Sequence, residues 1–265
     1  MQAMANMGLR AARQAGQIML RAMDRLESLH IEEKGRNDFV SNIDREAEAA
    51  IIEVLHKAYP HHGILGEEHG EAYKADEFTW IIDPLDGTTN YLHGIPHFCI
   101  SIALMKGNQF EHAVIVDPLR NEEFVASRGS GAQLNNRRIR VTNTIKLEDA
   151  ILSTGIPPGV IATHLESYMA MLESFTGQCR AIRRLGSAAL DLAYVAAGRT
   201  DGFWEFGLKR WDIAAGTLLV REAGGFVGDL AGGDDFFDSG SIVAANPKCF
   251  KAMVQAIRPH LSSGI

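Results

Sequence analysis

The chain has 265 residues, of which 46% are hydrophobic and 22% charged, the ordinary balance of a globular protein. Its net charge of −7 does not favour a dedicated nucleic-acid-binding protein, because such domains usually carry a strong basic excess. An acidic protein that handles phosphates needs a local source of positive charge, which bound metal ions supply.

The three cysteines are too widely spaced for a shared site. Cys99, Cys179 and Cys249 form no C-x-x-C pair and have no histidine pair nearby, which indicates neither a zinc site nor a disulfide framework. We therefore expect the reducing cytosol as the compartment. No apolar stretch approaches the roughly 18 residues that span a bilayer, so we expect no membrane partner.

Residues 1–23 contain three arginines and no acid, with apolar residues at helical spacing. Such a segment is either the first packed helix of the fold or an amphipathic organelle transit peptide. The helical period and the lack of a following cleavage signal favour the packed helix.

The rest of the first half predicts one further helix and a set of strands. The helix covers 43–57, with Ala47, Ile51, Ile52 and Leu55 on one face. Strands are expected at 62–65 and 78–83, then at 97–105, 110–116 and 122–126 with short polar turns between them. The last three strands predict an antiparallel meander.

The pattern changes near residue 145, where strands and helices begin to alternate. Strands are expected at 151–154, 180–183, 202–206, 226–229 and 241–245, and helices at 164–175, 187–197, 212–223 and 247–257. This alternation is typical of α/β architecture. The predicted organisation is an α+β half at 1–145, with an antiparallel sheet and metal-binding turns, joined rigidly to an α/β half at 146–265.

The hexapeptide Asp83-Pro84-Leu85-Asp86-Gly87-Thr88 directly follows an apolar strand. Proline restricts φ and removes a donor, which predicts a tight turn with both carboxylates on one side. Two anions so close repel each other unless a cation lies between them, and magnesium suits a few carboxylates with water and phosphate. The following Gly-Thr supplies N–H groups for a phosphate. The alternative is a surface turn with an Asx cap.

Two more acidic positions lie at the ends of apolar elements. Glu67 and Glu68 follow the predicted strand at 62–65, and Asp212 is expected at a helix start. Asp212 is either a helix N-cap or a metal ligand beside a helix end that favours anions. The small residues behind it, Ala214 to Gly216, leave open space there.

Three motifs occur in a fixed order: G-E-E at 66–68, D-P-L-D-G-T at 83–88 and W-D-I-A-A-G at 211–216. Together they resemble the signature set of the inositol monophosphatase family. Lys34 followed by Asp44 is similar to that family's N-terminal pattern, and 183–189 resembles its G-[ST]-A segment. The resemblance covers nearly the whole chain, and the stretch G-S-A-A-L-D-L-A-Y-V-A-A-G-R is most similar to the bacterial SuhB-type branch.

The resemblance implies a layered α-β-α-β-α sandwich of the inositol monophosphatase and fructose-bisphosphatase type, with the active site between the halves. It implies one magnesium ion held by Glu67, Asp83 and the Leu85 carbonyl. A second would be held by Asp83, Asp86 and Asp212, and a third, weaker one would lie near Glu67.

The resemblance also implies roles in catalysis. Thr88, oriented by Asp44 and Glu67, would position a water that attacks phosphorus in line, without a covalent intermediate. Glu205 falls where the family has an acid that contacts the substrate. The substrate-binding residues so implied are Asp86, Gly87, Thr88, Gly186, Ser187, Ala188, Glu205 and Asp212.

The expected enzyme is a lithium-sensitive phosphatase for myo-inositol monophosphate and small monoesters such as glycerol 2-phosphate. A 3′-phosphoadenosine or fructose-bisphosphate phosphatase is an alternative that the modest length disfavours. Another alternative is a SuhB-like accessory factor in ribosomal RNA transcription antitermination, binding a Nus factor and RNA polymerase, with direct RNA contact left open. Arg183 and Arg184 are then candidates for a partner or homodimer interface, or for a structural ion pair.

Overall fold

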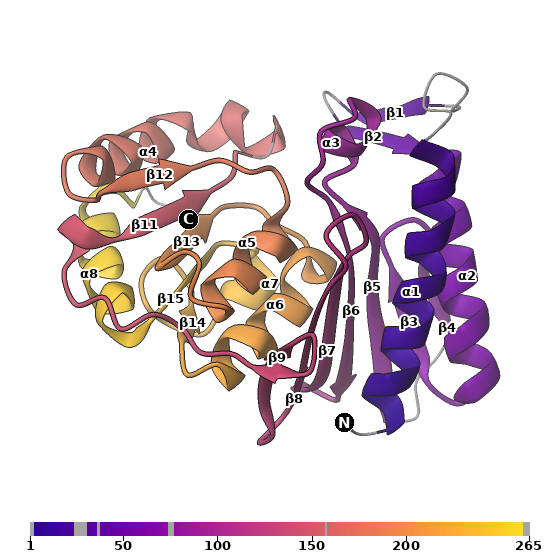
Figure 1. The fold of residues 1–265 in the computed structure, drawn as a ribbon. Coiled ribbons are helices and arrows are strands. Elements are labelled where there is room, and N and C mark those ends of the chain that lie inside the picture. Colours follow the sequence, from indigo (N-terminus) through magenta and orange to yellow (C-terminus); the bar gives the residue numbers. More distant parts are fainter. Residues whose placement is uncertain (1–2, 24–30, 36–37, 74–76, 157, 262–265) are drawn as a thin grey trace.

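The computed structural model describes residues 3–23, 31–35, 38–73, 77–156 and 158–261. The chain forms five layers in the order α-β-α-β-α, as Figure 1 shows from right to left. The first layer is α1 (Ala3–Met23) with α2 (Asn42–Ala58), the middle layer is α5 (Ala188–Ala196) with α6 (Arg210–Glu222), and the last is α4 (Pro158–Thr176) with α8 (Pro247–Ile257). The layered sandwich predicted from the sequence is confirmed.

The larger sheet has eight strands in the order β10-β9-β8-β7-β6-β5-β3-β4. The pair β3 and β5 is parallel, with Gly66 opposite Ile82, and every other pair is antiparallel. The strands are β3 (Gly63–Gly66), β4 (Gly70–Tyr73), β5 (Phe78–Asp86), β6 (Cys99–Lys106), β7 (Gln109–Asp117), β8 (Glu122–Ser127), β9 (Gly131–Leu134) and β10 (Arg137–Arg138).

Besides a separate two-stranded sheet of β1 (Ile31–Gly35) and β2 (Asp38–Ser41), the chain forms a second sheet of five strands in the order β12-β11-β13-β15-β14. Its first three strands are parallel and the remaining pairs antiparallel, so the second half is a mixed α/β layer. The strands are β11 (Ile151–Thr154), β12 (Ala181–Arg183), β13 (Gly202–Glu205), β14 (Phe226–Gly228) and β15 (Ile242–Ala245).

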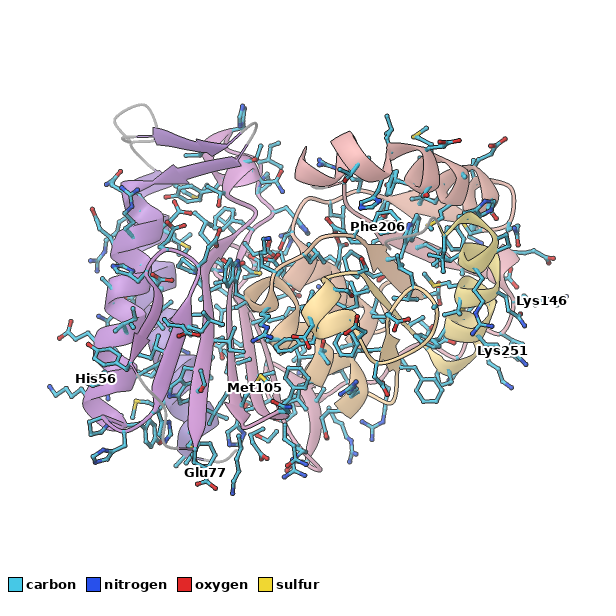
Figure 2. All side chains as sticks on the ribbon, turned by 180° about the vertical axis from the view of Figure 1, so that it is seen from behind. His56, Glu77, Met105, Lys146, Phe206 and Lys251 are labelled. Carbon is cyan, nitrogen blue, oxygen red and sulfur yellow. The ribbon has the colours of Figure 1, made fainter. Side chains whose placement is uncertain are left out.

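Three hydrophobic cores fill the spaces between the layers. Figure 2 labels one buried residue from each of two cores: Met105 where the larger sheet meets the middle helices, and Phe206 beneath α4. The third core joins α1 and α2 to the outer face of the larger sheet, and it includes Ala15, Met19 and Trp80. The packed-helix interpretation is thereby confirmed for Ala3–Met23.

Several short elements were not predicted. They are β1 (Ile31–Gly35), β2 (Asp38–Ser41), β4, α3 (Thr88–Leu92), β9, β10 and α7 (Phe236–Ser239), together with 3₁₀ turns at Leu147–Asp149 and Arg258–His260. Most of these segments are polar or contain glycine, so they lack the apolar pattern that marks a buried element. In the described part of the chain, no helix has both the length and the apolar character needed to cross a membrane.

Candidate metal and phosphate site

The motif at 83–86 is part of a strand. The prediction of a tight turn there is wrong, because β5 continues through Asp86 with one irregularity: Asp83 lies opposite Ser101, and Asp86 lies opposite Cys99. This insertion is a β-bulge, which redirects side chains locally. The Leu85 N–H donates to Asp83 Oδ1 at 3.0 Å and holds the bulged segment.

Glu67 lies beside Asp83 because their strands run parallel. Gly66 at the end of β3 is opposite Ile82 on β5, and the Glu67 N–H donates to the Ile82 carbonyl at 3.1 Å. The residues that follow Gly66 and Ile82 are both acids, Glu67 and Asp83, so their side chains are neighbours. Burial raises the pKa of Asp83 well above its usual range, and the charges of Glu67, Asp86 and Asp212 raise it further.

Asp212 comes from the other side of the site, on α6. It is the third residue of the helix, so the interpretation of Asp212 as the N-cap residue is wrong: Lys209 is the N-cap. Asp212 Oδ2 accepts a hydrogen bond from the Lys209 N–H at 2.7 Å, which satisfies one free donor of the first turn. The Ser101 hydroxyl donates to the Trp211 carbonyl at 3.3 Å and joins this helix end to β6.

Asp86 connects the larger sheet to α5. Its Oδ2 accepts from the Ser187 hydroxyl at 2.6 Å and from the Ala189 N–H at 2.7 Å. Burial raises the pKa of Asp86, although these hydrogen bonds act in the opposite direction. Ser187 is also the N-cap of α5, so the predicted 186–188 segment lies directly against the acid cluster.

The chemistry of this cluster fits divalent cations. Glu67, Asp86 and Asp212 each raise the pKa of the buried Asp83 through their charges, and a buried group of anions is stable only with protons or cations between them. The described residues contain no preassembled group of three or more His, Cys, Asp or Glu side chains that closes around an ion. The individual metal ligands therefore stay a prediction.

The Thr88 hydroxyl lies between two oxygen acceptors. It is 3.0 Å from the Leu85 carbonyl and 3.2 Å from Asp44 Oδ1, and Asp44 is only 1% exposed. The hydroxyl has one proton, so it donates to one acceptor at a time. The predicted pair of Thr88 and Asp44 is thus brought together, and the Leu85 carbonyl lies beside it.

The loop after β5 requires glycine. Gly87 has φ of +94°, and a Cβ there would lie 3.0 Å from the His97 carbonyl and 3.2 Å from the Gly186 carbonyl. Asn90 Nδ2 donates to the same His97 carbonyl at 2.8 Å and to the Leu185 carbonyl at 2.9 Å. The two predicted phosphate and substrate segments, at 87–88 and 186–188, are therefore neighbours.

Glu205, at the end of β13, is 7% exposed and faces the cluster. A methyl group at Gly155 would overlap its carboxylate. Burial raises the pKa of Glu205 well above its usual range, with further increases from Asp191, Asp212 and Asp86, while the positive charge of Arg184 opposes them. Arg183 and Arg184 are both exposed. The charge of Arg184 lowers the pKa of the buried Glu205, while the Arg183 guanidinium donates to the Ile182 carbonyl at 3.0 Å.

Sequence reasoning missed three polar residues of this region. Asn90 follows the phosphate motif by two residues, and Asp191 is 1% exposed on α5 with no hydrogen-bond partner for Oδ1. Glu48 is fully buried on α2. Its spacing of four residues from Asp44 was the available signal, because such residues share a helix face. The side chain of Lys34 lies outside the described residues. Cys99, Cys179 and Cys249 form no disulfide.

Comparisons with known proteins find similarity to inositol monophosphatases and to SuhB proteins along nearly the whole chain. The sequence model described as "Inositol monophosphatase family" matches residues 1–262. The Nus factor SuhB of Pseudomonas aeruginosa is 53% identical over 265 residues, covering 98% of both chains.

Two solved structures extend the similarity to the fold. The extragenic suppressor protein SuhB of Bartonella henselae superposes with a TM-score of 0.94 at 45% identity, covering 100% of both chains. The inositol monophosphatase of Anabaena sp. has a TM-score of 0.86 at 36% identity, covering 96% of this chain and 95% of its own.

Proposed function

This chain belongs to the inositol monophosphatase family, and on that premise we propose that it is a magnesium-dependent phosphomonoesterase acting on myo-inositol monophosphate and similar small monoesters. One observation carries the proposal: the pairing of Gly66 with Ile82 places Glu67 beside the buried Asp83, and the charges of Glu67, Asp86 and Asp212 raise the pKa of that carboxyl. The shared repulsion favours binding of hard cations with oxygen ligands.

The residues proposed to hold one ion are Glu67, Asp83 and the Leu85 carbonyl. Asp83, Asp86 and Asp212 would hold a second, and a third, weaker ion would bind near Glu67. Magnesium bound there neutralises phosphate charge and lowers the pKa of water. Magnesium binds a few carboxylates together with several waters, which suits this small set of acids.

Thr88 is proposed to orient the attacking water. With its proton donated to Asp44, the hydroxyl oxygen has free lone pairs that accept a hydrogen bond from water. Glu67, at the end of the neighbouring strand, would share in this orientation. The contribution is one of position, since the side chain forms no bond to phosphorus.

The substrate would be held by backbone and acid groups. N–H groups of Gly87 and Thr88 would bind the phosphate, because Gly87 lets the chain approach closely in its left-handed conformation. Asp86, Asp212, Glu205 and the backbone of Gly186, Ser187 and Ala188 would contact the ligand around its hydroxyls.

The test is a phosphatase assay with myo-inositol 1-phosphate, glycerol 2-phosphate and an aryl phosphate. Activity is expected with magnesium, none after chelation, and inhibition by lithium. Asp149→Asn is the matched control, since Asp149 lies in an exposed ion pair with Arg180 before β11 and β12, whereas Glu205 is at the other end of the parallel strand β13. Full activity in the chelated protein, or none on any ester with magnesium, would reject the proposal.

A second role in transcription is supported by a different observation, the 53% identity to a protein named Nus factor SuhB. We propose that the chain, in the cytoplasm and as a homodimer, also binds a Nus factor and RNA polymerase in ribosomal RNA antitermination. Arg183 and Arg184 are the proposed interface residues.

Mutations at two different places would separate phosphatase activity from partner binding. Arg183→Ala is the cleaner surface probe, because the charge of Arg184 reaches the buried Glu205 and Asp191. We expect Asp86→Asn to keep partner binding in a pull-down from cell extract and to lose phosphatase activity, and Arg183→Ala to do the reverse. If wild type retains no transcription protein, the second role is wrong.

A further inference from the structure

Glu48 is a fully buried acid in the middle of α2, one helical turn after Asp44. Burying a carboxylate is costly unless hydrogen bonds compensate for the lost water. Glu48 Oε1 accepts from the Glu68 N–H at 3.1 Å, and Oε2 accepts from the His69 N–H at 2.9 Å. The His69 ring contacts Oε2 as well. All these partners lie on the turn that contains Glu67.

The turn packs closely against this carboxylate. A methyl group added to Gly66 would overlap Glu48 Oε1, so the absence of a side chain at 66 is what allows the contact. On the other side, the Glu67 N–H donates to the Ile82 carbonyl at 3.1 Å. The backbone of Glu67 is therefore held by β5 on one side, while its neighbours in the turn are held by the Glu48 carboxylate on the other.

We propose that Glu48 is a positioning residue that sets the orientation of Glu67 toward Asp83. The inference rests on the proposed function for its effect on magnesium, while its structural part does not. Through Asp44 and Glu48, α2 then holds two separate segments of the site: Asp44 contacts Thr88, and Glu48 holds the Glu67 turn.

Glu48→Gln is the main variant, because it keeps the side-chain volume. Its amide group presents one oxygen and one NH₂ to several donors, so at least one hydrogen bond to the turn is lost. Glu53→Gln is the matched control, since Glu53 lies on the same helix with its side chain exposed. Gly66→Ala disturbs the same contact from the turn, because the added methyl group displaces the carboxylate of an otherwise unchanged Glu48.

The first measurement needs neither metal nor substrate. Amide hydrogen exchange, followed by NMR in metal-free protein, should be at least tenfold faster at Glu68 and His69 in Glu48→Gln. Exchange in the β7 and β8 amides should not change. Unchanged exchange at Glu68 and His69 in a folded variant would overturn the proposal.

The second measurement is magnesium binding by titration calorimetry. Loss of a residue that orients a ligand typically weakens metal affinity about 10–100-fold. We expect that loss in Glu48→Gln and Gly66→Ala but not in Glu53→Gln. With magnesium raised to saturation, kcat of Glu48→Gln should recover to within about tenfold of wild type, with little change in KM.

A double variant guards against simple misfolding. In Glu48→Ala the space beside Gly66 opens, so adding Gly66→Ala should cost much less magnesium affinity than it does in wild type, a non-additivity typical of direct contact. Additive losses would overturn the positioning role. If wild type binds magnesium but hydrolyses no ester, the proposed function fails, while the exchange and binding results still decide the role of Glu48.

Discussion

Thr88 Oγ1 lies 3.2 Å from Asp44 Oδ1, although 44 residues separate them in the chain. The contact joins the first residue of α3 to the first turn of α2. The hydroxyl has one proton, so it donates either to Asp44 or to the Leu85 carbonyl, which lies 3.0 Å away.

Thr88→Ala should lower kcat about 100-fold through lost positioning. Magnesium affinity should change little, since no carboxylate is removed. Thr88→Ser retains the hydroxyl and should restore most of the activity. Steady-state kinetics beside calorimetry separates these effects, and a defect confined to magnesium affinity would contradict the assigned role.

Asp86→Asn should reduce turnover by several orders of magnitude at saturating magnesium, because a charged ligand is lost with little change in volume. The metal-free variant should be at least as stable as wild type. Burial raises the pKa of Asp86, so its charge is disfavoured in the folded state and a neutral side chain relieves that cost. Urea unfolding of both proteins measures the difference. Near-normal turnover would exclude Asp86 as a ligand.

Glu205→Gln should discriminate between substrates. A carboxylate accepts hydrogen bonds from ring hydroxyls better than an amide does, and one such bond is worth about a tenfold change in kcat/KM. We expect a larger loss with myo-inositol 1-phosphate than with glycerol 2-phosphate or an aryl phosphate. Equal losses on the three esters would make Glu205 a structural residue.

His97 predicts a pH dependence of stability. Burial lowers its pKa to about 4 from 6.5, with Arg120 acting in the same direction and Asp117 opposing. In the unfolded chain His97 is protonated below pH 6.5, whereas in the folded chain it is protonated only below about pH 4. Stability is fully present above pH 6.5 and is lost as pH falls, by about 2 kcal/mol at pH 5.

His97→Gln should remove this part of the acid sensitivity. The measurement is the free energy of unfolding in urea at pH 7 and pH 5 for the metal-free proteins. His61→Gln, at an exposed position, serves as the control and should keep the wild-type difference. A wild-type slope in His97→Gln would show that other groups cause the acid sensitivity.

The sequence by itself determined the long elements and the identity of the acids. The helical period of 1–23 and the apolar face of α2 predicted packed helices, since burial of one face stabilises such segments in almost any tertiary context. Likewise, the apolar run before Asp83 predicted the strand that carries it. The motif order identified Glu67, Asp83, Asp86 and Asp212 as a set before any distance was known.

Only the tertiary structure decided how these acids are placed relative to one another and which residues hold them in place. Glu67 lies beside Asp83 because β3 and β5 pair in parallel with Gly66 opposite Ile82, a register that local sequence does not specify. A bulge in β5, not a turn, orients Asp86. For Glu48 the sequence offers only its spacing from Asp44, which does not predict burial because Glu is rarely buried. It is buried because the turn at 66–69 folds over it and supplies its hydrogen bonds.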